Sequence, residues 1–253
     1  MIVLKTQAEI ALMRESGRIL AKARRLASEK ALPGVTTGEL DEIIHDVIKS
    51  EGATPSFLNY QGSGPSPFPK SSCLSVNEEV VHGIPGKRTL EAGDIIGIDI
   101  GVYKDGFHTD SAWTFPVGEV SEETKLLLRV TREAMEKGIE KAKPGARIGD
   151  IAAAIEKHVQ SFNFGIVREL VGHGIGRSLH EEPSVPNFGR SGTGPKIKEG
   201  MTFCIEPMVN LGTWKVKTLS DGWTMVAADG RYSAHFEHTV AIGKNGAEIL
   251  TIE

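Results

Sequence analysis

Gly93-Asp-Ile-Ile-Gly-Ile-Asp-Ile-Gly-Val-Tyr-Lys-Asp-Gly-Phe-His-Thr-Asp-Ser-Ala-Trp-Thr114 is the stretch that decides the fold, because it has the pattern of two strands joined by a tight turn. A run of apolar residues predicts the first strand: Ile95, Ile96, Ile98, Ile100 and Val102. Asp105-Gly106 predicts the turn, since both residue types accept a positive φ at low cost. The chain then returns as a second strand up to Phe115.

Each of these two strands carries one carboxylate, Asp99 in the first and Asp110 in the second. If Asp105-Gly106 forms a two-residue loop, Asp99 faces Ala112, and Asp110 faces Gly101 across the hairpin. Side chains alternate along a strand, so both carboxylates then lie diagonally on one face; a three-residue loop would separate them. Two buried carboxylates are costly unless a cation or a shared proton lies between them. The pair therefore indicates a metal site, a shared proton or, as the structural alternative, two surface aspartates near a hairpin.

Composition places the chain among ordinary globular proteins. Its 253 residues are 40% hydrophobic and carry a formal charge of −4, which suits one large domain or two small ones and gives no electrostatic case for nucleic acid. Two cysteines, Cys73 and Cys204, do not suggest a disulfide framework. There is no secretory signal pattern and no apolar run of the ~18 residues that a membrane span needs. We expect a cytoplasmic, soluble protein.

Four amphipathic helices are predicted by their start and stop signals. Thr6 with Glu9, and Thr36 with Glu39, match the capping box at the start of the first two helices. A third helix begins at Ser121 and stops before Pro144-Gly145, and a fourth runs from about 148 to 162. Residues 165–253 are predicted to be mainly strands and turns, and residues 61–67 an exposed loop.

The order of two helices followed by strands occurs twice. Residues 31–40 are similar to residues 142–151, and residues 93–99 are similar to residues 200–206, at similar offsets. Chance similarity of helix-start signals is the alternative. The repeat predicts an α+β fold with two related helix-helix-strand halves, about 1–120 and 121–253, within a single catalytic domain of residues 1–253. A pseudo-two-fold axis would then bring Asp99 and its counterpart Glu206 toward a common centre.

Five side chains form the candidate ligand set: Asp99, Asp110, His173, Glu206 and Glu237. Four oxygen donors and one imidazole suit Mn²⁺, Fe²⁺, Co²⁺ or Zn²⁺ and match copper or iron–sulfur centres poorly. Four carboxylates carry enough negative charge for two divalent ions.

Several motifs occur in order along nearly the whole chain: Ser75-Val-Asn-Glu, Val81-His-Gly-Ile-Pro, Asp105-Gly-Phe-His-Thr-Asp, Gly172-His-Gly-Ile-Gly-Arg, His180-Glu-Glu-Pro, Met201-Thr-Phe-Cys-Ile-Glu-Pro-Met, Asp221-Gly-Trp-Thr and Glu237-His-Thr. Together they resemble the type I methionine aminopeptidases, which have the pita-bread fold, a central antiparallel sheet between two pseudo-symmetric halves. The chain departs from that pattern at residues 61–67, where relatives usually have a short link, at Leu179, where many carry Phe, and at Cys204, where Thr is common.

The resemblance implies roles for the ligand set. Asp110 and Glu237 would bridge two divalent metal ions, Asp99 would complete one site, and His173 and Glu206 would complete the other. Glu206 would also be the base that takes a proton from the attacking water.

The resemblance also implies how the substrate is held. His180 would steady the scissile carbonyl as it becomes an oxyanion, and His82 would hold the amide nitrogen of the next residue. The methionine side chain would lie in a pocket formed by Phe57, Tyr60, Phe68, Cys73, Leu179 and Trp223, where thioether sulfur packs well against aromatic edges.

The implied function is co-translational removal of the initiator methionine from nascent proteins with a small second residue, by water activated at a two-metal site. The implied partners are the N-terminal Met peptides of nascent chains and, transiently, the ribosome; we expect a monomer without membrane or direct nucleic-acid binding. Two alternatives stay open. One is another pita-bread peptidase, such as an X-Pro aminopeptidase or prolidase, and the other is a non-catalytic pita-bread binding protein.

The remaining histidines and cysteines carry weaker signals. His45 and His158 are expected to be solvated helix residues, and His108 is either a partner of the ligand set or simply packed. His235 shares the strand face of Glu237 but has no predicted role. Cys73 is interpreted as a pocket wall, because a nucleophilic thiolate needs a nearby base, and Cys204 as a packing residue.

Overall fold

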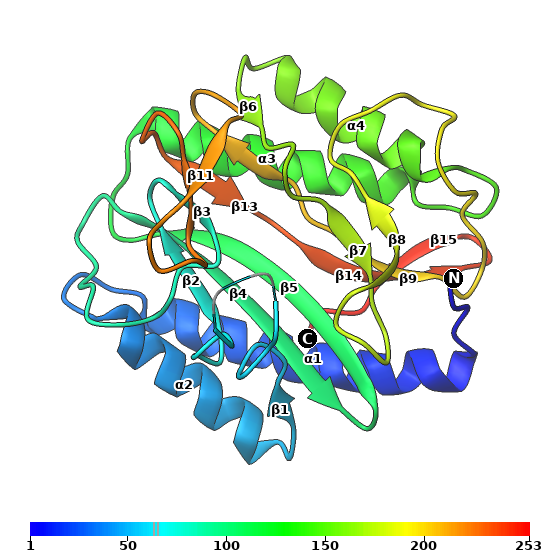
Figure 1. The fold of residues 1–253 in the computed structure, drawn as a ribbon, viewed down its shortest axis with the longest axis horizontal. Coiled ribbons are helices and arrows are strands. Elements are labelled where there is room, and N and C mark those ends of the chain that lie inside the picture. The colour runs from blue at the N-terminus through cyan, green and yellow to red at the C-terminus, as the bar shows by residue number, and fades with distance from the viewer. Residues whose placement is uncertain (63, 65) are drawn as a thin grey trace.

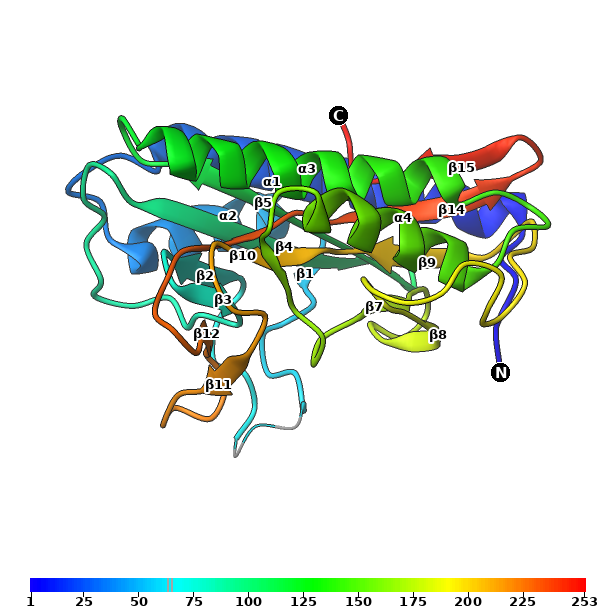
Figure 2. The same cartoon turned by 90° about the horizontal axis from the view of Figure 1, so that it is seen from above.

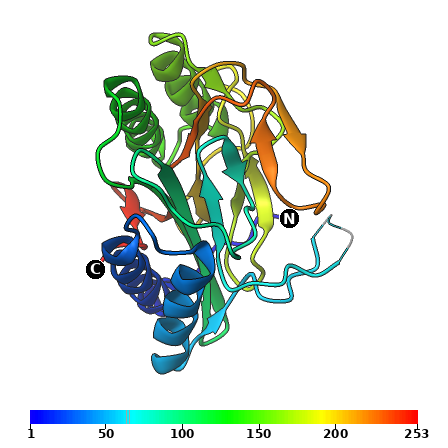
Figure 3. The same cartoon turned by 90° about the vertical axis from the view of Figure 1, so that its left-hand side faces the viewer.

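The protein is built in layers, with the helices on one side of a set of antiparallel sheets (Figures 2 and 3). The computed structural model describes residues 1–62, 64 and 66–253. The helices are α1 (Gln7–Lys30), α2 (Thr37–Ser50), α3 (Glu122–Lys141) and α4 (Ile148–Gln160). The strands are β1 (Thr54–Pro55), β2 (Cys73–Val76), β3 (Glu79–Val81), β4 (Ile95–Lys104), β5 (Phe107–Pro116), β6 (Gly165–Ile166), β7 (Gly172–Gly174), β8 (Glu181–Val185), β9 (Thr202–Ile205), β10 (Met208–Asn210), β11 (Val216–Thr218), β12 (Met225–Ala227), β13 (Ser233–His235), β14 (His238–Gly243) and β15 (Gly246–Ile249).

The predicted helix starts are confirmed. The Glu9 N–H donates to Thr6 Oγ1 at the start of α1, and the Thr6 N–H donates back to the Glu9 carboxylate. The same reciprocal pair joins Thr36 and Glu39 at α2. Ser121 caps α3 through the Thr124 N–H. Each cap satisfies backbone donors that the helix itself leaves free. The predicted end of the fourth helix at about residue 162 is two residues too far, because α4 ends at Gln160.

The hairpin of β4 and β5 has the predicted register. Asp99 pairs with Ala112, and Gly101 pairs with Asp110, so the loop has two residues. Asp105 and Gly106 have φ values of 50° and 87°, the positive values that this kind of tight turn requires. Asp99 and Asp110 therefore share one face of the sheet, diagonal to each other.

Two pairs of helices cover two parts of the sheet layer, as Figure 1 shows with α1 and α2 at one edge and α3 and α4 at the other. Apolar residues of α1 and α2 pack on β4. They are Ile19 and Leu20 of α1, Leu40 and Ile44 of α2, and, on the strand, Ile96, Ile98 and Ile100. Apolar residues of α3 and α4 pack on β9 and β14. They are Leu127 of α3, Ile151 and Ile155 of α4, and, on the strands, Phe203, Ile205 and Val240. Burial of these stripes supplies most of the stabilisation of each helix pair.

Two main sheets meet at the centre of the molecule. One contains β1, β2, β4 and β5, and the other has the order β15-β14-β9-β7-β8. The Glu237 N–H donates to Ala112 O at 2.8 Å, and Ser111 Oγ donates to Glu237 O at 2.5 Å. These bonds connect β5 to the start of β14, although the residues lie more than 120 positions apart.

Two further predictions concern chain segments outside this centre. Among the described residues, no helix is both long and apolar enough to cross a membrane.

The predicted loop of residues 61–67 includes Ser63 and Pro65, which lie outside the described residues. Its base is closed by backbone hydrogen bonds, from the Phe68 N–H to Tyr60 O and from the Asn59 N–H to Phe68 O.

Candidate metal centre and substrate pocket

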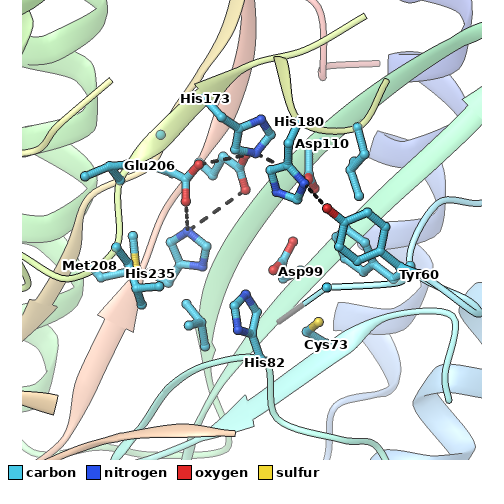
Figure 4. A pocket seen from close by; sticks show the side chains of 18 of the residues that line it. Tyr60, Cys73, His82, Asp99, Asp110, His173, His180, Glu206, Met208 and His235 are labelled. Carbon is cyan, nitrogen blue, oxygen red and sulfur yellow. Dashed lines mark hydrogen bonds and ion pairs between the residues drawn. The ribbon is translucent and has the colours of Figure 1, made fainter. Parts of the chain in front are cut away.

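All of the predicted site residues line one cavity of about 350 Å³. The predicted ligands there are Asp99, Asp110, His173, Glu206 and Glu237, and the predicted substrate contacts are Phe57, Tyr60, Phe68, Cys73, His82, Leu179, His180 and Trp223. Figure 4 shows the carboxylates and histidines pointing into this space from several strands.

The strand layer explains why the five candidate ligands meet. Asp99 and Asp110 come from the hairpin, and Glu237 lies between β13 and β14, where its N–H is bound to β5. His173 lies in β7, and Glu206 follows β9 directly. Since β7 pairs with β9 and β9 with β14, the central strands deliver all five side chains to one place.

The distances within this group are those of donors that can share a cation. His173 Nε2 lies 3.5 Å from Glu206 Oε1 and 4.0 Å from Asp110 Oδ2. One oxygen each from Asp99, Asp110 and Glu237 lie within 4.8 Å of one another. His173 Nδ1 contacts Gly174 O at 2.9 Å, so its N–H donates there and the Nε2 lone pair faces the carboxylates.

Each carboxylate in the cluster has an oxygen without a partner. Asp99 Oδ1, Asp110 Oδ1, Glu206 Oε1 and Glu237 Oε1 are buried and accept no hydrogen bond from any described residue. Buried polar atoms are normally satisfied, and an unsatisfied charged oxygen is especially costly. Oxygen donors with one imidazole are the ligands that hard and borderline divalent ions prefer, so these residues fit a metal centre.

The electrostatics of the cluster support the same reading. Burial raises the pKa of Asp99 to about 7. Burial, and then repulsion from Glu237 and Asp99, raises the pKa of Asp110 well above its usual value. Burial and neighbouring carboxylates do the same to the pKa of Glu206 and of Glu237. A cation among these four groups would favour their ionised forms.

The two predicted substrate histidines lie beside the cluster. The His180 and His173 ring centroids are 4.2 Å apart, and Tyr60 Oη lies 2.6 Å from His180 Nδ1. Burial lowers the pKa of His82 to about 4 and that of His180 in the same direction, so both rings are neutral near pH 7. His82 has a φ of 59°, and a Cβ on the next residue, Gly83, would lie 2.4 Å from Leu74 O. This close approach to β2 carries His82 into the cavity.

An apolar wall completes the cavity. Phe57, Phe68, Cys73, Leu179 and Trp223 belong to one buried cluster, with Tyr60 packed against it. The Phe68 and Trp223 rings meet edge to face at 5.2 Å, and Trp223 Nε1 donates to Ser66 O at 3.1 Å. The wall and the acidic cluster together can hold an apolar side chain next to a polar reaction centre.

Sequence reasoning gave no role to two residues that lie at the cluster. His235 lines the cavity and is 4% exposed. Cys204, interpreted as a packing residue, is fully buried, but its Sγ and single ligand atoms of His173 and Glu237 also lie within 4.8 Å of one another. Strand parity had already placed His235 on the face of Glu237, and it could have pointed to Cys204 in the same way, because Cys204 precedes Glu206 by two positions.

The other histidines lie outside the cluster. The expectation that His45 and His158 are simply solvated is wrong, because both are half-buried and hydrogen-bonded, to Ser71 and Glu133 respectively. Both pairings join a helix to residues more than 20 positions away, which helical periodicity does not reveal. His108 pairs with Ser56 and packs on Tyr103, so it is a packed residue.

Comparison with known proteins places the whole chain in one family. Residues 11–244 match the model of metallopeptidase family M24. A methionine aminopeptidase of Clostridium perfringens is 54% identical over 252 residues, which cover 100% of this chain and 99% of that protein. Methionine aminopeptidase 1 of Bacillus subtilis is 51% identical over 251 residues and 99% of both chains.

Solved structures agree with the sequence matches. A methionine aminopeptidase from Thermotoga maritima superimposes with a TM-score of 0.97 at 45% identity and covers 100% of both chains. A prolidase from Pyrococcus horikoshii, at 22% identity and a TM-score of 0.78 over 64% of its length, shares the fold alone. The predicted α+β pita-bread fold is confirmed, and the chain belongs to metallopeptidase family M24.

Proposed function

We propose that this protein removes the N-terminal methionine from nascent proteins whose second residue is small. One observation carries the proposal: His173 and four carboxylates, each with an unsatisfied oxygen, meet beside an apolar pocket, in a chain similar over its full length to methionine aminopeptidases. A peptide whose first side chain fills the pocket would place its first peptide bond beside the acidic cluster.

The proposed centre takes two divalent ions. Asp99, Asp110 and Glu237 would hold one ion. His173 and Glu206 would hold the other, together with Asp110 and Glu237. Bound divalent ions of this kind polarise a carbonyl and lower the pKa of water to about 7. The chemistry of the donor set suits Co²⁺, Mn²⁺, Fe²⁺ or Zn²⁺.

The chain's own groups would handle protons and orientation. Glu206 Oε1 lies 3.5 Å from His173 Nε2, and the Glu206 carboxylate would take the proton from the attacking water. His180 would donate to the carbonyl oxygen as negative charge develops there, with its ring held by Tyr60. His82, on the opposite side of the cavity in Figure 4, would contact the amide of the second residue.

The apolar wall would select methionine. Phe68 and Trp223 present aromatic edges, with which a thioether sulfur packs favourably. Phe57, Tyr60, Cys73 and Leu179 would close the rest of the pocket around the unbranched side chain. Phe68 lines the cavity although it directly follows the unusual 61–67 segment.

The remaining expectations stay predictions. We propose a single domain of residues 1–253 with halves of about 1–120 and 121–253, acting as a cytoplasmic monomer that contacts the ribosome transiently. Gel filtration with light scattering would test the oligomeric state, and co-sedimentation with ribosomes would test the transient contact.

A peptide assay tests the proposed function. With added Mn²⁺ or Co²⁺, we expect methionine release from Met-Ala-Ser and little from Met-Leu-Ser or Ala-Pro-Ser. EDTA should abolish release, and restored metal should recover it. Preferential cleavage before proline, whatever the first residue, would instead assign the X-Pro class. Metal binding without cleavage of any of these peptides would favour the non-catalytic alternative.

A further inference from the structure

His235 is a buried histidine that the proposed mechanism does not use. It ends β13, where Met208 of β10 is its backbone partner. Its N–H donates to Thr114 Oγ1 at 2.9 Å, and the same hydroxyl donates to His235 O at 2.8 Å. The backbone at this residue is therefore fixed against the central hairpin, and the residue is 4% exposed.

The outer ring nitrogen of His235 faces two carboxylates. His235 Nε2 is buried and has no hydrogen-bond partner among residues 1–62, 64 and 66–253. It lies 4.0 Å from Glu206 Oε2 and 3.9 Å from Glu237 Oε2, and Figure 4 shows the ring below Glu206 with a dashed line to that carboxylate. Each distance is about 1 Å longer than an N–H···O hydrogen bond.

The two oxygens of Glu206 have different neighbours. Oε1 faces His173 Nε2 at 3.5 Å, whereas Oε2 faces His235 Nε2. A cation held by His173 would take Oε1 and leave Oε2 turned toward His235. Carboxylates in metal centres are commonly held by a hydrogen bond from a neighbouring side chain, which fixes their rotation.

His235 as one more metal ligand is the competing possibility. Two donors on one ion, each about 2.1 Å from it, lie at most about 4.2 Å apart, so distance alone allows this. A further ligand would, however, fill a position that a catalytic centre keeps open for water and substrate. The position of Nε2 beside Glu206 Oε2, on the other side of this carboxylate from His173, favours a donor that supports the ligand.

We propose that His235 is a positioning residue whose Nε2–H donates to Glu206 Oε2 and so orients the carboxylate that serves as ligand and base. This inference rests on the proposed metal centre and assigns the Nε2–H tautomer. It needs a shift of about 1 Å, and hydrogen bonds at catalytic sites are often long before the complete complex forms.

Wild-type protein gives the first test, with Mn²⁺ as the only added ligand. Pulsed EPR counts the imidazole nitrogens directly coupled to the bound ion. One coupled imidazole, that of His173, is the expected result. Two coupled imidazoles would make His235 a ligand and would overturn the proposal. This measurement needs no variant that might fail to fold.

Two variants give the second test by calorimetric titration with Mn²⁺. His235→Leu removes the donor and should weaken Mn²⁺ binding by about 10- to 100-fold. His235→Gln restores an N–H donor of similar reach and should bind within about threefold of wild type. Equal loss in both variants would contradict a donor role. His238→Gln is the matched control, because this buried histidine pairs with Thr251.

The two proposals fail in different ways. Both tests use metal alone, so loss of Mn²⁺ affinity in His235→Leu supports the positioning role even if no methionyl peptide is cleaved. If the enzyme is active, His235→Leu should lower kcat more than it changes KM, because the pocket that binds methionine is untouched. Unchanged kcat and unchanged Mn²⁺ affinity in His235→Leu would overturn the inference while the proposed function stands.

Discussion

Asp41 and Asp110 are equally buried, each 5% exposed, but their surroundings differ completely. Asp41 Oδ1 accepts three hydrogen bonds, from the Ser71 N–H, the Ser72 N–H and Ser72 Oγ, at 2.8–3.0 Å. Asp110 Oδ1 has no partner among the described residues and lies beside other acids. The chain supplies the hydrogen-bond donors of the Asp41 carboxylate, whereas Asp110 Oδ1 is free to bind a ligand.

This difference separates a structural acid from a candidate metal ligand. A protein folds around a carboxylate at low cost when backbone and hydroxyl donors surround it. Four carboxylates that each leave one oxygen without such a donor among the described residues are unfavourable together, and a cation would relieve this. Burial alone therefore does not identify a site, whereas several neighbouring buried acids with unpartnered oxygens indicate one.

The largest expected effect tests the open cluster. Glu206→Gln keeps the shape of the side chain but removes the proton acceptor, and kcat for Met-Ala-Ser should fall by about 10²- to 10⁴-fold. Steady-state kinetics at saturating Mn²⁺ measure this loss. Glu248→Gln is the control, because Glu248 is an exposed partner of Arg14, and its kcat should stay near wild type. A Glu206→Gln enzyme with full activity would refute the assignment of the base.

Asp41 should show the opposite pattern, with a loss of stability and no loss of chemistry. Asp41→Ala leaves two buried N–H groups and one hydroxyl without their acceptor and should lower the free energy of unfolding by about 2–5 kcal/mol. Urea unfolding measures this change. The folded fraction should keep the kcat of wild type, and a variant as stable as wild type would show that the two carboxylates do not differ as described.

Asp99→Asn should stabilise the metal-free protein, because the folded state raises the pKa of Asp99 to about 7. The unfolded value is about 3.9, so the folded state binds more protons between these values and stability falls as pH rises from about 4 to about 7. Asn cannot ionise and should remove this loss. In EDTA we expect a gain of about 1–3 kcal/mol at pH 8 and almost none at pH 4.

Urea unfolding in EDTA at the two pH values measures that gain. Asp46→Asn, at an exposed position of α2, is the control and should leave the pH dependence unchanged. A metal-free Asp99→Asn protein that is less stable than wild type at pH 8 would mean that the cluster carries no electrostatic strain.

The smallest expected effect concerns His180, a histidine whose ring nitrogen has a hydrogen-bond partner within the chain. Tyr60→Phe removes the hydroxyl that contacts His180 Nδ1 at 2.6 Å and keeps the ring in the pocket. A neutral hydrogen bond contributes about 0.5–1.5 kcal/mol, so kcat/KM should fall by about 2- to 10-fold. Tyr103→Phe, on the half-exposed face near His108, should change nothing. An unchanged Tyr60→Phe enzyme would show that His180 needs no such support.

The sequence predicted the parts of this molecule that depend on neighbours along the chain. The hairpin register followed from Asp105-Gly106, and the helix starts followed from hydroxyl and carboxylate pairs three residues apart. Strand parity placed Asp99 and Asp110 on one face, and the internal repeat brought in Glu206, whereas the roles of the five candidate ligands were implied by the family resemblance. The residues of the apolar wall, including Phe68, were likewise implied by the resemblance.

Contacts between distant segments could not be predicted in the same way. Tyr60 meets His180 across 120 positions, and His235 meets Glu206 only because β13 pairs with β10, which begins two residues after Glu206. Asp41 gave no signal at all, since its three donors come from a loop that no periodicity connects to α2. Sequence patterns identify candidate groups, but which of them have partners depends on tertiary packing.

The two-residue turn between β4 and β5 also has a kinetic consequence. Hairpins close within microseconds, so Asp99 and Asp110 become neighbours early when the chain folds. Glu237 reaches the hairpin through Ser111 from 126 positions away, and contacts over such spans form late. We expect a refolding chain to acquire its affinity for a cation only after its last third has docked.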